Sequence, residues 1–154
     1  MSVPVHREPV REQWIDYNGH LSEPYYVLVF GHATDGLMDH VGLGPAYRAR
    51  TGSSLYTAEA HVRYLREVDL GAELDVRARV LGTSAKTVHY CLEMSVGGGL
   101  VSTEELLGVH VDSESGRSVP LPEPVRAALE QLVESPPGYA GRAVGLQPAP
   151  AGEA

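Results

Sequence analysis

Residues 24–40 read PYYVLVFGHATDGLMDH, a long apolar segment that opens on a proline. Proline suits the first turn of a helix, and Ser22 or Glu23 just before it can cap that helix. Residues 25–30 leave no polar face, so we expect the first half of the helix to be buried. Glycine and proline at 42–45 end it. The segment predicts one long helix, from about residue 24 to about residue 40, at the centre of the fold.

Strand patterns lie on both sides of this helix. Residues 8–17 read as a first strand, and a loop rich in glycine and arginine follows the helix. Four more strands are then predicted. They are residues 56–65, a strand with Leu74, Val76, Ala78 and Val80 on one face, residues 87–96 and residues 100–112. Glycine-containing turns at 82–84 and 97–99 separate the last three. Alternation within the first of them places Tyr56, Ala58, Ala60, Val62 and Tyr64 on one face and Thr57, Glu59, His61 and Arg63 on the other. Strands joined by short turns around one apolar helix indicate an α+β fold, an antiparallel β-sheet wrapped around a long central helix.

The domain limits follow from length and composition. A chain of 154 residues suits one domain with a core large enough to fold alone. Residues 122–134 predict a short amphipathic helix, and proline, glycine and alanine dominate from residue 135 onward. We therefore expect one domain over residues 1–134 and a disordered tail over residues 135–154.

Bulk charge and composition exclude several classes of protein. The net charge of −8 argues against a general nucleic-acid binder. The sequence lacks an apolar run of about 18 residues, so no membrane span is expected. The single cysteine, Cys91, excludes an internal disulfide, and no signal peptide is evident, which favours the cytoplasm. Arginines and Lys86 gather between residues 48 and 86, where they could hold a phosphorylated ligand or cover solvated strand faces.

The residues best suited to chemistry directly precede the predicted helix. Asp16, Asn18 and His20 bring a carboxylate, a carboxamide and an imidazole into five residues. A carboxylate can act as a base or a nucleophile, and a helix N-terminus offers unpaired N–H groups to a developing oxyanion. Together these groups suit attack on an acyl carbonyl.

This order of elements and residues resembles the hotdog fold, and within it the 4-hydroxybenzoyl-CoA thioesterase-like acyl-CoA thioesterases. Asp16 and Gly19 match the Asp-x-x-Gly pattern of that family, and Asp16, Asn18 and His20 match the Asp-x-Asn-x-His motif of related plant thioesterases. The resemblance implies that Asp16 is the catalytic base or nucleophile and that the backbone N–H at Glu23 polarises the thioester carbonyl. Asn18 would orient water or substrate, and His20 would position Asp16 or donate to the thioester oxygen.

The chain departs from the family pattern in two places. Ser22 and Glu23 stand where relatives often carry a pair of Asn or Asn and Asp residues, and Trp14 stands where many carry a second Asp. Both departures change side chains that would contribute to the acyl pocket in those relatives.

A narrower resemblance points to the betainyl-CoA thioesterases of carnitine breakdown. It lies in Arg50-Thr51-Gly52 and in residues 56–67, which read YTAEAHVRYLRE. The trimethylammonium group of betaine requires aromatic faces and a carboxylate. The residues expected to bind it are Trp14, Tyr25, Tyr26, Tyr56 and Glu59.

Other interpretations of these residues remain open. Asp16 and His20 could hold a metal with His32, His40 or His61, but no zinc-type spacing is present, so neither a metal nor a cofactor is expected. Glu67 either matches an acidic residue of the plant enzymes or is a solvated strand charge. Asp35 lies at a helix position used in another hotdog branch, but far from the helix start.

Two other functions compete with the thioesterase hypothesis. The first is a hotdog module that binds acyl-CoA without turnover. The second is a hotdog dehydratase, which relies on a His–acid pair in another setting.

Self-association is also expected. One sheet covers only one side of an apolar helix and leaves free edges, which predicts a homodimer or a dimer of dimers with the active site between protomers.

Overall fold

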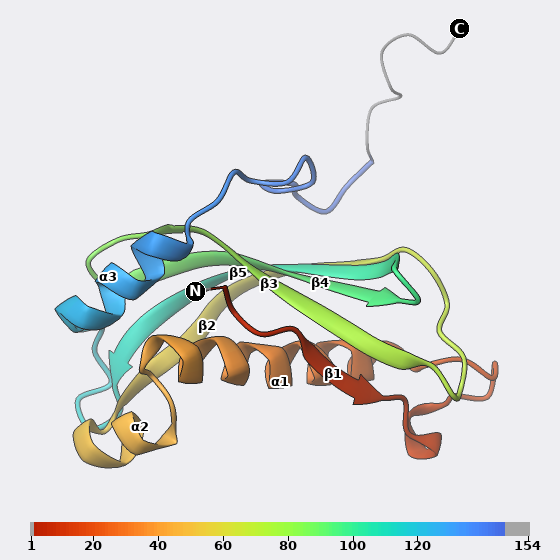
Figure 1. Cartoon of the computed structure of the whole chain (residues 1–154), viewed down its shortest axis with the longest axis horizontal. Coiled ribbons are helices and arrows are strands. Elements are labelled where there is room, and N and C mark those ends of the chain that lie inside the picture. The colour runs from red at the N-terminus through yellow and green to blue at the C-terminus, as the bar shows by residue number, and fades with distance from the viewer. Residues whose placement is uncertain (1, 147–154) are drawn as a thin grey trace, which may run out of the picture.

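The computed structural model describes residues 2–146. A five-stranded antiparallel sheet in the order β1-β3-β4-β5-β2 curls around the long helix α1, Glu23–Val41 (Figure 1). The strands are β1 (His6–Pro9), β2 (Ser53–Tyr64), β3 (Glu73–Thr83), β4 (Thr87–Val96) and β5 (Gly99–Asp112). Three short helices complete the fold: the 3-10 helix Glu12–Trp14, α2 (Pro45–Thr51) and α3 (Glu123–Leu132). The predicted α+β hotdog arrangement is confirmed.

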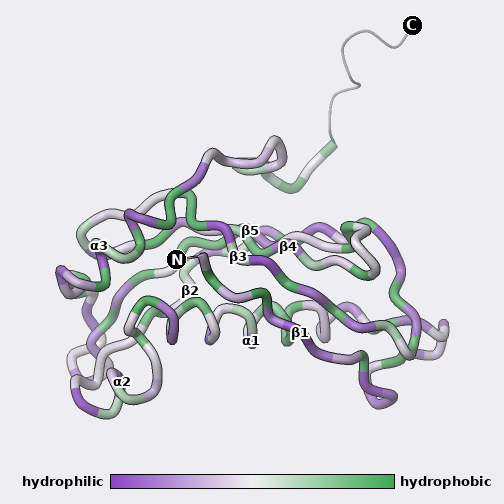
Figure 2. The backbone as a smooth tube through the Cα atoms, in the orientation of Figure 1, coloured by the Kyte–Doolittle hydropathy of each residue, from purple (hydrophilic) through white to green (hydrophobic). Residues whose placement is uncertain are grey.

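The core lies between α1 and the inner face of the sheet. Strand β4 presents a row of fully buried side chains to the helix: Val88, Tyr90, Leu92 and Met94. The matching row of α1 is Val29, Phe30, Ala33 and Leu37. Apolar and polar residues alternate along much of the sheet (Figure 2), as expected where one face is buried.

Helix α1 is less buried than predicted. Ser22 is its N-cap residue by backbone conformation, and Gly42, with a φ of 92°, ends it in the left-handed region. The prediction that its first half is buried is wrong for Val27 and Leu28, which are 40% and 42% exposed. Within one chain the sheet covers only one side of the helix, so an apolar face stays open.

Two predicted elements at the start of the fold need correction. The strand expected over residues 8–17 is wrong in extent, because β1 covers only His6–Pro9 and the 3-10 helix Glu12–Trp14 follows it. The expected loop after α1 contains a further helix, α2. Proline at position 45 suits its first turn.

A bulge in β2 reverses part of the predicted alternation. The register against β5 shifts between Thr57 and Glu59, so Tyr56 pairs with Val109, whereas Val62 pairs with Glu104. Directly opposed residues of antiparallel strands share a face. Tyr56 and Glu59 therefore lie on the outer face of the sheet, away from α1, and the prediction that Tyr56 shares a face with Tyr64 is wrong. A second bulge keeps Gly82 and Thr83 inside β3, so the turn begins after them.

The segment after α3 crosses the outer face of the sheet, opposite α1 (Figure 1). The hydroxyl of Tyr139 donates to Glu93 at 2.9 Å, and the N–H of Gly141 donates to Glu105 at 2.8 Å. The guanidinium of Arg63 lies 4.3 Å from the ring centre of Tyr139. These contacts fix the start of the predicted disordered tail against the sheet, and residues 147–154 of that tail lie outside the described residues. Across residues 2–146, no helix has the length and apolar character that a membrane crossing requires.

Candidate active site

A tight turn gathers the three polar residues that precede α1. The Asp16 N–H donates to the His20 carbonyl and the Gly19 N–H to the Asp16 carbonyl, both at 3.0 Å. The φ of 81° at Gly19 is readily adopted by glycine. The Asn18 N–H donates to Asp16 Oδ1 at 2.8 Å, which fixes the carboxylate relative to the turn.

This turn forms one wall of an open pocket of about 750 Å³. Its lining combines the turn, the start of α1 and the segment after β2: Asp16, Asn18, His20, Leu21, Glu23, Tyr26, Tyr64, Leu65, Arg66 and Glu67. The structure thus brings together the four residues predicted to act in catalysis, Asp16, Asn18, His20 and Glu23. Because α1 begins at Glu23, the N–H of that residue has no acceptor inside the helix.

The opposite wall is formed by the chain segment that follows β2. The N–H of Leu21 donates to the Val68 carbonyl at 2.8 Å, and the hydroxyl of Tyr26 donates to the Arg66 carbonyl at 3.1 Å. These bonds hold residues 65–68 beside the turn. Sequence reasoning missed Leu65 and Arg66 as pocket residues, because their place depends on this long-range pairing.

His20 lies beside two carboxylates of that segment. Its Nε2 is 3.2 Å from Glu67 and 3.5 Å from Asp69. Both carboxylates are largely exposed, whereas His20 is about two-thirds covered. We call His20, Glu67 and Asp69 the pocket cluster. Glu67, for which sequence reasoning left two interpretations open, therefore lies in the pocket with Asp16.

Two tyrosines form the aromatic part of the pocket. The rings of Tyr26 and Tyr64 meet edge to face, with centroids 5.1 Å apart, and the Tyr64 hydroxyl reaches the Glu23 carbonyl at 3.5 Å. Burial raises the pKa of both phenols, so both stay neutral at pH 7. Tyr64 was not among the predicted substrate-binding residues.

Four of the five residues predicted to bind the substrate lie outside this pocket in the single chain. Trp14 is buried and stacks on Tyr25, with ring centroids 5.6 Å apart. Tyr56 and Glu59 are on the outer face, where Glu59 lines a separate pocket with His61 and Glu105. Tyr26 alone among the five lines the pocket of Asp16.

A buried carboxyl lies on the inner face of the sheet, and sequence reasoning missed it. Glu104 is 4% exposed, opposite Val62 on β2 and Leu92 on β4, and its burial raises its pKa to about 7. It lies on the same face as Tyr64 and interacts with it electrostatically. No hydrogen bond or ion pair of its side chain is present within residues 2–146. The sequence carries no clear signal for it, because the residues that share its face, Ser102, Leu106 and Gly108, do not form an apolar row.

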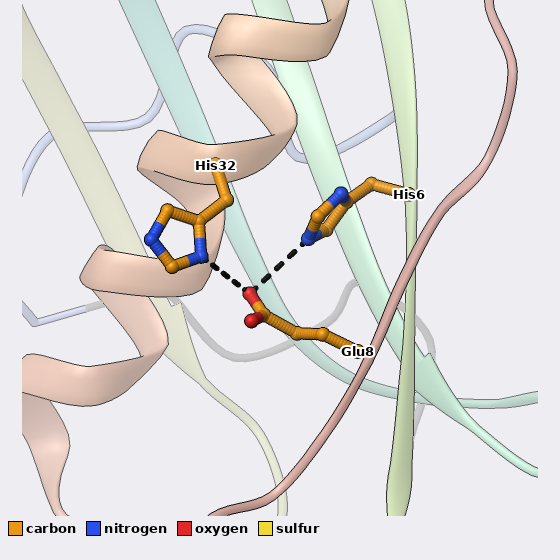
Figure 3. Close-up of side chains that lie close together, drawn as sticks. All are labelled: His6, Glu8 and His32. Atoms are coloured by element: carbon orange, nitrogen blue, oxygen red, sulfur yellow. Dashed lines mark hydrogen bonds and ion pairs between the residues drawn. The ribbon is translucent and has the colours of Figure 1, made fainter.

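The structure separates most of the candidate metal ligands considered from the sequence, and His32 alone among them lies in a group within residues 2–146 that could share an ion. His20 contacts Glu67 and Asp69, and His61 lines the pocket on the outer face, so neither completes a site with Asp16. Among the described residues, the group with ligand atoms close enough to share an ion is His6, Glu8 and His32 (Figure 3). We call it the strand cluster.

Known proteins resemble this chain in sequence over most of its length. The sequence profile described as the thioesterase-like superfamily matches residues 10–129. The chain is 39% identical to a betainyl-CoA thioesterase of Pseudomonas aeruginosa, over 95% of this chain and 96% of that protein. It is 41% identical to an L-carnitine dehydrogenase/betainyl-CoA thioesterase of Agrobacterium fabrum, over 91% of this chain but only 30% of that longer protein.

Solved structures share the fold. A putative thioesterase of Pseudomonas putida KT2440 superposes with a TM-score of 0.80 at 34% identity, covering 96% of this chain and 99% of that one. A hypothetical protein of Staphylococcus aureus, solved in complex with CoA, superposes with a TM-score of 0.85 at 24% identity, covering 93% of this chain and 94% of that one.

Proposed function

Because the chain belongs to the thioesterase-like superfamily and is a thioester hydrolase, we propose that it hydrolyses betainyl-CoA to betaine and free CoA. The observation that carries this proposal is the 39% identity to a betainyl-CoA thioesterase across nearly the full length of both proteins. The pocket in front of α1 supports it, because it combines the groups that thioester attack and cation binding require.

Asp16 is the group we propose for the chemical step. Its carboxylate either removes a proton from the attacking water or attacks the thioester carbon itself, and both routes fit a carboxylate held by the Asn18 N–H. The Glu23 N–H at the start of α1 would donate to the oxygen that becomes negative in the tetrahedral intermediate. His20 and the Asn18 side chain would position water, substrate or Asp16.

The acyl group of betaine sets a tight spatial requirement. Its nitrogen is separated from the thioester carbonyl only by a methylene, so the cation must be bound close to Asp16. The pocket supplies the tyrosine rings of Tyr26 and Tyr64 and the carboxylate of Glu67 at that place. Contact of a desolvated cation with an aromatic face is worth about 0.5–2 kcal/mol. Glu104 adds a further negative group on the same face of the sheet when ionised.

The carrier part of the substrate requires positive charge. The pantetheine arm separates the CoA phosphates from the thioester, so the phosphates lie away from Asp16. Arg66 is the arginine of the region between residues 48 and 86 that lines this pocket, and its guanidinium suits the polar groups of the arm nearest the thioester.

The direct test compares a cationic acyl group with its neutral counterpart of the same shape. We expect kcat/KM for betainyl-CoA to exceed that for 3,3-dimethylbutyryl-CoA by about ten- to thousandfold, since two aromatic contacts could supply that difference. Benzoyl-CoA serves as the aromatic comparison. Equal values for the first two would contradict the cation-binding proposal, and binding without any turnover would favour the non-catalytic acyl-CoA module.

We also propose that the chain self-associates as a homodimer or a dimer of dimers, with the active site between protomers. Support comes from the exposed Val27 and Leu28 on α1 and from β2, which is an edge strand of the sheet. Light scattering at micromolar concentration should give a mass of at least two chains. An active species of 16.5 kDa would contradict this proposal.

A further inference from the structure

We propose that His6, Glu8 and His32 form a binding site for a divalent transition-metal ion of the zinc type. The site lies between β1 and α1, apart from the pocket of Asp16, and it is independent of the thioesterase reaction (Figure 3). No metal was expected from the sequence, because no zinc-type spacing is present, and His6 and Glu8 were not among the candidate ligands.

The fold brings the three side chains to one point. His6 and Glu8 are two positions apart on β1, so their side chains project from the same side of the strand. That side faces α1, where His32 projects toward them from the middle of the helix (Figure 3). Strand β1 is held by its pairing with β3 and α1 by its packing in the core, so two separately anchored elements position the ligands.

The distances between the ligand atoms are close to those of a metal site. His32 Nδ1 lies 2.6 Å and His6 Nε2 lies 3.1 Å from the same Glu8 oxygen. The three ligand atoms lie within 4.8 Å of one another. Zinc bonds of about 2.0–2.2 Å would place tetrahedral ligands about 3.3 Å apart. The two separations from the Glu8 oxygen thus differ from this spacing by less than about 1 Å.

The donor set selects the class of ion. Two imidazole nitrogens and a carboxylate form the ligand set of several zinc sites with an open coordination position. Magnesium and calcium prefer oxygen ligands, so two histidines argue against them. The carboxylate of Glu8 is only 11% exposed, whereas His32 is 39% exposed, which leaves solvent access for a water ligand.

The position of the site indicates what bound metal would do. Strand β1 is a short edge strand that pairs only with β3 in the sheet. An ion held by His6, Glu8 and His32 would cross-link this strand to α1 and stabilise the folded state by mass action. Without metal, the same atoms form the hydrogen bonds from the imidazoles to Glu8, and metal entry displaces those protons.

The test measures zinc binding by the full chain, free of any polyhistidine tag and stripped of metal by a chelator that is then removed. Calorimetric titration with zinc chloride, with metal analysis after dialysis, should give one zinc per chain with micromolar affinity and a higher melting temperature. His32→Ala should weaken binding by about a hundredfold or more, since even the loss of an outer-shell contact costs about 10–100-fold in metal affinity. His40→Ala, a histidine change farther along the same helix, should leave binding and the melting shift intact.

Two further measurements keep the result interpretable. Glu8→Gln preserves the shape of the side chain and should weaken zinc binding as His32→Ala does, which covers the case that one variant fails to fold. Cobalt should give visible absorption bands of a tetrahedral site in the wild type but not in either variant. Wild-type protein that binds no zinc, or zinc binding that survives both His32→Ala and Glu8→Gln, would overturn the proposal.

Discussion

Two histidine–carboxylate clusters flank the first half of α1, and they differ in almost every physical respect. In the pocket cluster, His20 is 3.2 Å and 3.5 Å from Glu67 and Asp69, whose side chains are 77% and 82% exposed. In the strand cluster, two imidazoles lie 2.6 Å and 3.1 Å from one oxygen of Glu8, which is 11% exposed. The same residue types thus form a loose cluster in one place and a compact one in the other.

The difference teaches that residue type alone does not indicate a role. The pocket cluster adjoins Asp16 and the N-terminus of α1, and its two carboxylates are largely exposed, so little fixes the partner of His20. The strand cluster lies between two packed elements, so its geometry is set before any ligand arrives. A loose cluster suits a site that rearranges during a reaction, whereas a compact cluster suits the binding of an ion or the stabilisation of the fold.

The largest effect should come from the carboxylate beside the pocket cluster. Asp16→Asn is nearly isosteric but removes the base or nucleophile, so we expect kcat to fall by about 10²–10⁴-fold with substrate binding largely kept. Glu114→Gln is the control for exchanging a carboxylate for an amide, because Glu114 lies in the exposed turn after β5, away from the pocket. Its kcat should stay within about twofold of the wild type. An Asp16→Asn enzyme that keeps more than about a tenth of the wild-type kcat would contradict the proposed mechanism.

Glu104 differs from the carboxylates of both clusters, because it has no cationic or hydrogen-bonding partner within residues 2–146. Its folded-state pKa of about 7 is above the ordinary value of 4.5, so the protonated form favours folding. That contribution is complete below the unfolded pKa and is lost as pH rises through about 7. We therefore expect Glu104→Gln to raise the free energy of unfolding at pH 8 by about 3 kcal/mol, and to change it little at pH 4.

Urea denaturation of both proteins at the two pH values checks this expectation. A difference that does not depend on pH would show that Glu104 acts through packing instead of charge. A stability gain on removing the carboxylate would fit a group that is retained for substrate, as proposed for the cationic acyl head.

The sequence predicts those parts of the molecule that depend on local patterns. Strand β4 has the predicted limits, because apolar residues alternate along it and turns bound it. Asp16, Asn18 and His20 meet because a turn of five residues cannot separate them. The face of Tyr56 could not be predicted, because the bulge in β2 depends on its pairing with β5, whereas Glu59 shares a face with His61 and Arg63 as predicted.

Long-range packing explains what else the sequence did not predict. Arg66 and Glu67 reach Asp16 only because Leu21 pairs with Val68. His32 reaches Glu8 only because β1 packs on α1. Neither contact has a pattern in the sequence, and the inward position of Glu104 has none either, because the residues that share its face on β5 are not predominantly apolar.

A smaller effect is expected from the pocket cluster itself. His20→Ala should lower kcat/KM for betainyl-CoA by about tenfold, because the imidazole has a positioning role and its contacts are long and exposed. Glu67→Gln, which keeps the shape of its side chain, should lower kcat/KM less and should raise KM if Glu67 faces the substrate cation. Steady-state kinetics with betainyl-CoA and 3,3-dimethylbutyryl-CoA separates these roles. Loss of activity as large as that of Asp16→Asn would make His20 a direct participant in the chemistry and would remove the contrast between a positioning imidazole and a reacting carboxylate.

The smallest effect should come from the compact cluster in the absence of metal. The hydrogen bonds from His32 and His6 lower the pKa of Glu8 below its usual value despite the opposing effect of its burial. A carboxyl whose folded-state pKa is depressed stabilises the protein above its unfolded pKa, and this contribution is lost as pH falls through the folded-state value. In chelator-treated buffer, Glu8→Gln should therefore lower the free energy of unfolding at pH 7 by about 1 kcal/mol, the usual net value of such bonds, with a smaller difference at pH 3.5. Glu73→Gln, at an exposed position of the neighbouring strand β3, controls for the loss of one negative charge and should change the free energy of unfolding by less than about 0.5 kcal/mol. If the two variants behave alike, the short distances of the strand cluster contribute no stability without metal, and its compact geometry has to be explained by the ion it is proposed to bind.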